Sequence, residues 1–298
     1  MAMDTTKMDT TKIKLPVEVT QAIINKVGNT STIAALSPST PQLFLNEDYI
    51  VFNGAAEAEV VAEGQRKSSY EQTAASITGK KFKVQCTTRV TEELKWADED
   101  NRLEIISSIQ EDQTKAIARA LDYVIYHAIN PKSGGKLDGY EALTTKATSV
   151  TDSGDDIANV DALADAVNEY EINGVALSRT WASRLRKLRV PATGMRFYPE
   201  IPINLAAGTL DGIPAATSTT VDGTKAQTKT KVLGIMGDYS LIKWGMIRDI
   251  WAEVIQYGDP DQSGVDLKAN NQIAYRTEAM FSYAVLDPEA FAVLKEGE

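Results

Sequence analysis

The chain has 298 residues, of which 43% are hydrophobic and 24% are charged, and its formal net charge is −10. This length suggests about two domains, and this hydrophobic fraction can form a sizeable buried core. Direct binding to nucleic acid requires a surplus of Lys and Arg on at least one face, so the net negative charge disfavours it. Residues 179–189, RTWASRLRKLR, form a local basic run, for which a solvated helix face is the simpler interpretation.

Cysteine usage disfavours a disulfide-stabilised secreted protein, and hydropathy disfavours a membrane-spanning one. Cys86 is the only cysteine, so no disulfide can form within the chain, which points to folding inside a cell. No apolar run approaches the roughly 20 residues of a membrane span, and the polar N-terminus has no hydrophobic signal core. We therefore expect no association with a membrane.

The first predicted element is a short helix. Residues 15–28, LPVEVTQAIINKVG, place Pro16 at a first helical position and Gly28 just after the last turn. Residues 29–45 then predict extended chain that Pro38 and Pro41 interrupt.

The next segments predict a long two-stranded ribbon. Small and apolar residues alternate with glutamates over residues 57–63, and apolar residues alternate with polar ones over residues 81–86. A lone two-stranded ribbon is at best marginally stable in water, so we expect other structure to support this one. Its polar, turn-like tip consists of Glu63, Gly64, Gln65, Arg66, Lys67, Ser68 and Ser69.

A long helix is predicted over residues 97–130. Acidic residues crowd its first turn, and apolar residues keep helical spacing. At a rise of about 1.5 Å per residue, a helix of this length would extend roughly 45 Å. The polar residues 110–113, QEDQ, interrupt the apolar stripe, so we expect the middle of the helix to be half buried and to border other subunits. Pro131 and the glycines after it end the helix.

The remaining chain predicts a compact α/β unit followed by two strands. A polar linker at residues 144–156 precedes a helix from residue 157, a buried strand at 174–178 and a second helix that Ser178 caps. Residues 194–221 are expected to be rich in loops. Residues 246–256 and 278–286 predict two strands, and residues 258–271 connect them.

No motif predicts catalysis or a cofactor. His127 is the only histidine, and near a helix end an imidazole more often packs or caps. GDPDQSGVD, Gly258–Asp266, is similar to a calcium loop but lacks its spacing and final glutamate, so an acidic turn is the simpler interpretation. No Gly-rich phosphate loop occurs. We expect no catalytic residue, cofactor or metal, although paired carboxylates leave an acidic hydrolase as an alternative.

Several stretches, in this order, resemble the major capsid protein of tailed bacteriophages, and together they span nearly the whole chain. They are LPVEVTQAIINKVGNTSTIAAL, AEVVAEGQRKSSYEQTAASITGKKFKVQCTTRVTEEL, ARALDYVIYHAINPKSGGKLDGY, GTLDGIP, GIMGDYSLIKWG and YRTEAMFSYAVLDPEAFAVL. Each stretch alone is degenerate, and their common order carries the resemblance.

The resemblance implies an α+β fold, the phage major capsid fold, with four parts. These are an N-terminal arm (residues 1–53), an extended β-ribbon loop (54–80), a peripheral domain with a long spine helix (81–150 and 237–298) and an axial α/β domain (151–236). The extended loop of this family lies across a neighbouring subunit. The tip residues Glu63–Ser69 are therefore implied to make inter-subunit contacts, and the neighbour would supply the apolar surface that the ribbon lacks.

The implied function is structural and not enzymatic. The chain would self-assemble through hexamers and pentamers into the icosahedral head shell that encloses the phage genome, in the virion, after assembly in the host bacterial cytoplasm. DNA would be enclosed without sequence-specific binding, and separate scaffolding, portal and decoration proteins are the further partners to consider. Some family members carry a cleaved helical scaffolding segment before the arm, whereas twelve residues precede Ile13 here. A separate scaffolding protein, a mature form and assembly without scaffolding all stay open.

Two alternatives are kept. An encapsulin-like nanocompartment shares the implied fold, but encapsulins tend to begin with a helix and not with a polar arm. The acidic hydrolase belongs to another class, and size-exclusion chromatography separates it from a shell protein, because an enzyme elutes as a small oligomer and a capsid protein as megadalton particles or loose capsomers.

Overall fold

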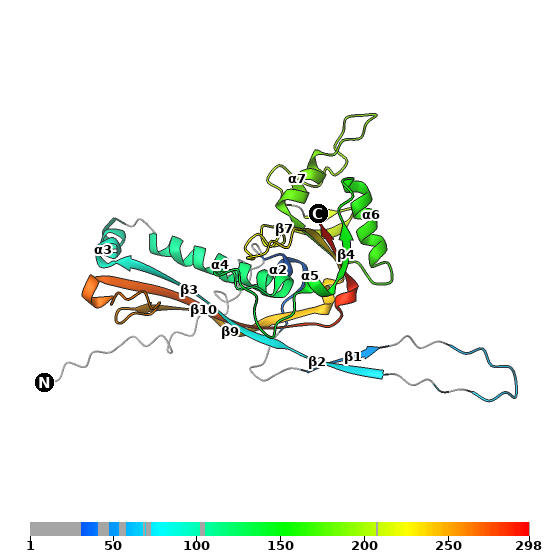
Figure 1. Ribbon diagram of the computed structural model, residues 1–298, viewed down its shortest axis with the longest axis horizontal. Helices are drawn as coiled ribbons and strands as arrows, with labels where there is room; N and C mark the ends of the chain where they lie inside the picture. Colours follow the sequence, from blue (N-terminus) through cyan, green and yellow to red (C-terminus); the bar gives the residue numbers. More distant parts are fainter. Residues whose placement is uncertain are drawn as a thin grey trace.

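A computed structural model describes residues 31–40, 48–53, 58–67, 69, 73–101, 105–206 and 208–297. It contains a three-stranded sheet, a six-stranded sheet and a separate two-stranded ribbon (Figure 1). The helix predicted at residues 15–28 lies outside the described residues. Among the helices of the described ranges, none has the length and apolar character needed to cross a membrane.

The three-stranded sheet is antiparallel, with β10 (Gln272–Val285) between β3 (Lys80–Thr91) and β9 (Ile242–Ile255). The two strands predicted at residues 246–256 and 278–286 are confirmed, and each begins earlier than predicted. Helices α3 (Glu92–Asn101) and α4 (Ile105–His127) run along one face of this sheet (Figure 1). Phe82 of β3 and Phe281 of β10 stack between sheet and helix, with ring centroids 5.4 Å apart.

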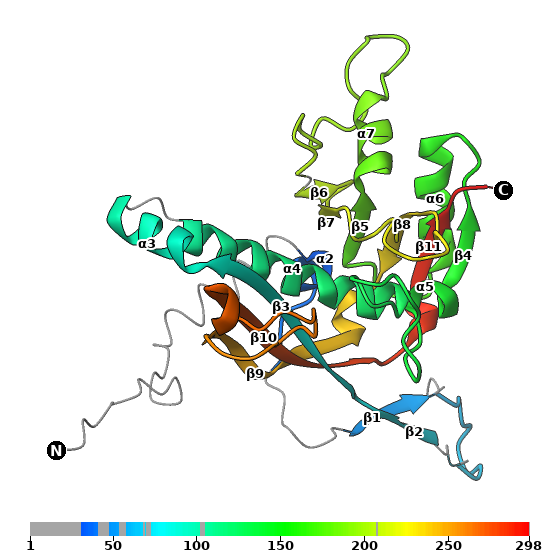
Figure 2. The same ribbon diagram turned by 60° about the vertical axis from the view of Figure 1, so that its left-hand side comes forward.

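The six-stranded sheet has the order β4-β11-β8-β5-β7-β6. Strand β11 pairs in parallel with β4, and β5 pairs in parallel with β7, whereas the other pairs are antiparallel. Helices α6 and α7 pack against it (Figure 2). The bounds are β4 (Thr148–Thr151), α6 (Asp156–Ala166), β5 (Gly174–Ser178), α7 (Arg179–Lys187), β6 (Thr209–Leu210), β7 (Ile213–Ser218), β8 (Val232–Gly237) and β11 (Phe291–Lys295).

The buried strand β5 and the helix cap after it are as predicted. All of β5 is buried, and the Ser178 side chain accepts a hydrogen bond from the Trp181 backbone N–H at 3.2 Å. Other strands of this sheet were missed, β11 near the end of the chain among them. Strand β4 lies in the segment predicted as a polar linker, and β6 and β7 lie in the segment predicted as loops. Strands β4, β6 and β7 are short and carry little apolar alternation, and they lie toward opposite edges of the sheet, so backbone pairing with the neighbouring strands decides their structure.

The predicted long helix is wrong at its start. Helical structure begins at Glu92, ahead of residue 97, and two helices are described, α3 and α4. The expected exposure of residues 110–113 is confirmed for Glu111 and Asp112, but Gln113 is 2% exposed. Its amide nitrogen donates to Thr88 Oγ1 at 2.9 Å and its amide oxygen accepts from Thr277 Oγ1 at 2.6 Å. A polar side chain can be buried there because its hydrogen bonds are made.

The first described segment is helical and not extended, contrary to the prediction for residues 29–45. Helix α2 (Thr32–Leu36) begins after Ser31, whose side chain accepts a hydrogen bond from the Ala34 backbone N–H at 3.2 Å. Ile33 of α2 is completely buried in the core that α4 shares with both sheets. The remaining short elements are α5 (Leu143–Lys146), η2 (Tyr239–Leu241), η3 (Lys268–Asn270) and η4 (Pro288–Ala290).

A buried carboxylate holds α2 against α4. Asp122 of α4 is fully buried, and it accepts hydrogen bonds from the Thr32 backbone N–H at 2.9 Å and the Ile33 backbone N–H at 3.3 Å. The hydroxyls of Ser31 and Thr32 also donate to it, and Thr220 Oγ1, from the loop after β7, donates at 2.5 Å. Burial raises the pKa of Asp122 above its ordinary value, against the effect of these donors. Three segments far apart in the sequence thus meet at one side chain.

We expect Asp122→Asn to lower the free energy of unfolding by about 2–4 kcal/mol. The amide –NH₂ of asparagine would face hydrogen-bond donors where the carboxylate has an acceptor oxygen, so buried N–H groups would lose their partners. Urea unfolding followed by circular dichroism measures this. Asp112→Asn, on the exposed part of the same helix, should change stability by less than about 0.5 kcal/mol. Equal effects of the two substitutions would contradict the role of Asp122.

The raised pKa of Asp122 gives a second expectation, for pH. A carboxyl whose folded-state pKa exceeds its unfolded value of 3.8 binds its proton more tightly in the folded state. The stability of the wild type relative to Asp122→Asn should therefore increase as the pH falls through the folded-state pKa, and level off below 3.8. Unfolding free energies of both proteins across this range test it, and a pH-independent difference would contradict it.

Candidate inter-subunit interface

Strands β1 (Asp48–Asn53) and β2 (Thr73–Thr78) form an antiparallel ribbon that joins neither sheet. Their register runs from Asp48 opposite Thr78 to Asn53 opposite Thr73, and Thr78 Oγ1 donates to Asp48 Oδ1 at 2.7 Å. The ribbon projects away from the body of the molecule in both views (Figures 1 and 2). A ribbon is therefore present as predicted, but it is built from other residues.

The predicted pairing of residues 57–63 with residues 81–86 is wrong. Residues 81–86 belong to β3 and pair with β10, which offers them a partner over the whole length of the strand. Residues 58–62 form no strand, in keeping with the weak strand preference of Ala and Glu. Strand β2 continues past Gly79 into β3, so one stretch of chain serves the projecting ribbon and then the body.

The tip of the ribbon is a fully exposed turn. The Gln65 backbone N–H donates to the Ala62 carbonyl at 3.1 Å, and Gly64 has φ +79, a left-handed conformation that glycine adopts without steric cost. Residues 62–67 and Ser69 are exposed, whereas Ser68 lies outside the described residues. Among the ion pairs of the described part of the chain, none includes Arg66 or Lys67.

Two apolar side chains of the ribbon also face solvent. Val60 is 101% exposed and Ile50 is 68% exposed. Sequence reasoning singled out neither residue, although Val60 stands in the alternating pattern and Ile50 in a short apolar run. Exposed apolar groups that gather on one projection are typical of a surface that another protein covers.

Two other projecting ends expose apolar side chains. In the loop after α7, Met195 is 68% and Phe197 is 41% exposed. In and beside the connection between β9 and β10, Tyr257 is 70% and Val254 is 48% exposed. These segments project from an elongated molecule (Figure 1), and Trp96 of α3 and Ile203 are further exposed apolar residues.

The acidic turn at residues 258–266 neutralises a cation of its own chain. Arg89 Nε donates to both carboxylate oxygens of Asp261 at 3.0 Å, and Arg89 Nη2 lies 2.5 Å from Asp259 Oδ1. The hydrogen bond from Arg89 lowers the pKa of Asp261 to about 2. Within the described ranges, no group of His, Cys, Asp and Glu side chains is arranged to hold a metal ion.

His127 is part of the packed structure, whereas the basic run at residues 179–189 exposes Arg179, Lys187 and Arg189 to solvent, as expected of a helix face. His127 is buried at the end of α4, and its Nε2–H donates to the Thr220 carbonyl at 3.0 Å. Burial lowers the pKa of this imidazole. In the basic run, Arg184 of α7 pairs with Asp152 at 2.7 Å and with Asp156 at 2.6 Å, and its hydrogen bond lowers the pKa of Asp152.

Comparison with known proteins decides the family. The model of the phage capsid family matches residues 13–296. The chain belongs to the phage capsid family.

Solved structures agree with this membership. A structure from Mycobacterium phage Ogopogo has 31% sequence identity and a TM-score of 0.80, and the match covers 90% of this chain and 92% of that chain. A structure from Gordonia phage Cozz has 28% identity, a TM-score of 0.75 and coverage of 90% and 87%. The capsid of a native GTA particle, at 14% identity and a TM-score of 0.61, covers 90% of this chain and 91% of that chain and shares the fold. No curated protein matches.

The expected α+β fold and the structural role are therefore confirmed. This capsid protein is a self-assembling structural protein of the phage head shell, and it is located in the virion. The encapsulin alternative is not favoured. The contacts predicted for Glu63–Ser69 stay a prediction, since the structure contains one copy of the chain.

We expect the double substitution Ile50→Ser and Val60→Ser to impair assembly of the capsid protein without unfolding it. Both side chains are exposed in the single chain, so the free energy of unfolding should change by less than about 0.5 kcal/mol. Burial of one such side chain at an interface contributes about 1.5–3 kcal/mol, so the concentration required for shell assembly should rise by about tenfold or more. Light scattering against concentration measures this, and unchanged assembly would show that neither side chain is covered by a neighbour.

Proposed function

We propose that the ribbon of β1 and β2 lies across a neighbouring copy in the shell, and that its tip, Glu63–Ser69, makes the inter-subunit contacts. One observation carries this proposal: the ribbon projects from the body with its apolar side chains Ile50 and Val60 in solvent. A two-stranded ribbon of this kind gains stability only from a surface that covers it. Arg66 and Lys67, which have no ion-pair partner among the described residues, would meet acidic groups of that neighbour.

The proposed division of the chain follows the same plan. Residues 1–53 form the arm, 54–80 the extended loop, 81–150 and 237–298 the peripheral domain, and 151–236 the axial domain. The three-stranded sheet and α4 are the centre of the peripheral domain. Strand β1 stands at the end of the arm, and β11 and β4 connect the peripheral segments to the six-stranded sheet of the axial domain.

The finer functional assignments belong to this proposal as well. The capsid protein acts without catalysis, cofactor or metal, in line with the packed state of His127 and the ion pairs of Arg89. Its copies form hexamers and pentamers in the host bacterial cytoplasm and enclose the genome without sequence-specific binding. Separate scaffolding, portal and decoration proteins would complete the head.

Replacement of residues 64–69 by a short Gly-Ser linker tests the proposal. The tip is exposed and contributes nothing to either core, so we expect a folded subunit with normal circular dichroism and an unchanged unfolding midpoint. Electron microscopy should show few or no closed shells, because the replacement weakens the same interface at every copy in the lattice.

The control is the double substitution Lys132→Ser/Lys225→Ser, which removes two exposed positive charges outside the ribbon and should leave both the unfolding midpoint and shell formation unchanged. Normal shells from the protein with the replaced tip would refute the assignment of the ribbon as an inter-subunit loop.

A further inference from the structure

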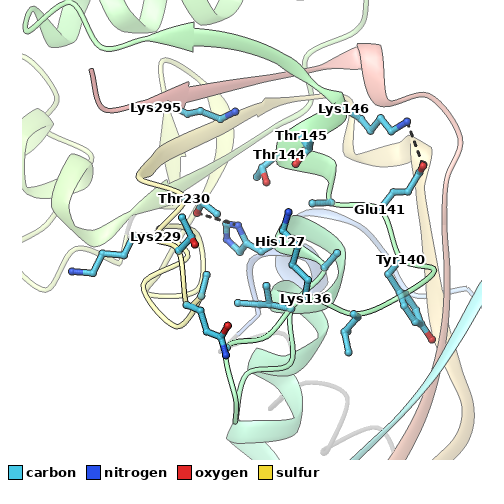
Figure 3. A pocket seen from close by; sticks show the side chains of 18 residues that line it. His127, Lys136, Tyr140, Glu141, Thr144, Thr145, Lys146, Lys229, Thr230 and Lys295 are labelled. Carbon is cyan, nitrogen blue, oxygen red and sulfur yellow. Dashed lines mark hydrogen bonds and ion pairs between the residues drawn. The ribbon is translucent and has the colours of Figure 1, made fainter. Parts of the chain in front are cut away.

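A cavity of about 770 Å³ lies where the end of α4 meets α5, the loop before β8 and the end of β11. Four lysines line it, namely Lys136, Lys146, Lys229 and Lys295 (Figure 3). We call it the lysine pocket. These lysines come from four separate segments of the chain, so the fold, and not a local run of basic residues, gathers their charges.

The charge of the lysine pocket is not balanced from within. Glu141 is its one acidic lining residue, and its carboxylate is already paired with Lys146 at 3.3 Å. Lys136, Lys229 and Lys295 form no ion pair with any residue of the described ranges. Like charges that share one concavity repel each other, and an anion that enters removes this repulsion. The chain as a whole has a net charge of −10, so the excess of positive charge in the pocket is opposite in sign to that of the whole protein.

The other polar groups of the pocket are neutral. The His127 Nε2–H donates a hydrogen bond to the Thr220 carbonyl. Burial lowers the pKa of the ring, so the imidazole adds no positive charge to the pocket. The Thr144 hydroxyl donates to the Tyr126 carbonyl at 2.7 Å, whereas Thr145 and Thr228 present exposed hydroxyls to the cavity. In Figure 3, the side chains of Lys136 and Lys295 extend into the space beside Thr144 and Thr145, and Lys229 extends away from it.

This set of donors suits phosphate, although lysine also pairs with carboxylates, as Lys146 does with Glu141. The guanidinium fork of arginine recognises carboxylates and phosphates in two-pronged fashion, and no arginine lines the pocket. Lysine binds phosphate as a point charge from many directions, and hydroxyls add hydrogen bonds to phosphate oxygens. Contacts of this kind read no base sequence, because they reach only the backbone of a nucleic acid.

We propose that the lysine pocket binds phosphate groups of the nucleic acid that the shell encloses. The cavity has room for more than one phosphate group, and the two lysines that extend into it, Lys136 and Lys295, come from separate segments, as suits a chain of phosphates better than a single free ion. Each copy offers few contacts, so its binding to the nucleic acid is weak, and contacts to phosphate make it independent of base sequence. Weak binding agrees with the acidic character of the rest of the protein and with the need to release the DNA. The inference rests on the proposed enclosure of DNA, but not on the proposed role of the ribbon.

The test uses the full-length, unassembled capsid protein and a short, fluorescently labelled DNA duplex. Fluorescence anisotropy at several salt concentrations compares the wild type with Lys136→Gln/Lys295→Gln. We expect the double variant to bind more weakly and to lower the slope of log affinity against log salt by about two, one for each phosphate group that a lysine no longer neutralises. Lys80→Gln/Lys187→Gln, which removes the same charge from exposed sites outside the pocket, should leave the slope nearly unchanged.

Competition experiments separate the sources of the anion. Inorganic phosphate that releases the duplex only at high, salt-like concentrations supports nucleic acid as the ligand, whereas tight binding of inorganic phosphate alone overturns that source in favour of a free phosphate ion. Polyglutamate that binds in the pocket when the duplex does not would identify an acidic protein segment and overturn the proposal. An equal loss of duplex binding in the two double variants would overturn it too, because it would reflect overall charge.

Electron microscopy of Lys136→Gln/Lys295→Gln separates this inference from the shell function. We expect normal shells, since these side chains are not part of either core. Normal shells with unchanged duplex binding refute the lysine pocket alone, and an absence of shells together with unchanged duplex binding places these lysines in a subunit contact and also refutes it.

Discussion

The buried carboxylate of Asp122 is the interaction on which the arrangement of the subunit depends. It joins the start of α2, the C-terminal part of α4 and the loop after β7, and it does so in a core that contains residues of both sheets. A carboxylate without a cation is costly to bury, and only several donors offset that cost. The segments that supply these donors must therefore be in place together. This requirement holds α2 and the loop after β7 against α4.

Away from this packed centre, the projecting parts of the subunit leave apolar side chains uncovered. The ribbon, the loop after α7 and the turn between β9 and β10 each expose apolar side chains that the single chain leaves in water. In an isolated enzyme these projections would be a liability for aggregation. In a member of the phage capsid family they are surfaces that other copies can cover, and the closed shell limits how far such association proceeds. The same exposure that destabilises the single subunit thus favours the assembled one.

Sequence patterns predicted those helices and strands whose structure follows from the polarity and spacing of their own side chains. The apolar run of β5, the cap at Ser178 and the paired strands β9 and β10 follow from local burial and spacing. The partner of residues 81–86 could not be predicted in this way, because pairing with β10 depends on a segment far along the chain. The burial of Gln113 depends on acceptors and donors from β3 and β10. The polar tip was identified from composition, whereas the lysine pocket is formed by four segments whose proximity no local pattern indicates.

Assembly from such surfaces requires contacts that are weak one at a time. An exposed ion pair of Arg66 or Lys67 with a neighbour would contribute about 0–1 kcal/mol, and the burial of Val60 or Ile50 about 1.5–3 kcal/mol each. Weak contacts can break and re-form while a shell grows, so that misplaced subunits leave. Their stabilising effects accumulate when each subunit is held by several neighbours at once, since the later contacts of a bound subunit form without a further loss of translational freedom. A ribbon with little apolar surface of its own is suited to this task, because its binding energy is realised only in the lattice.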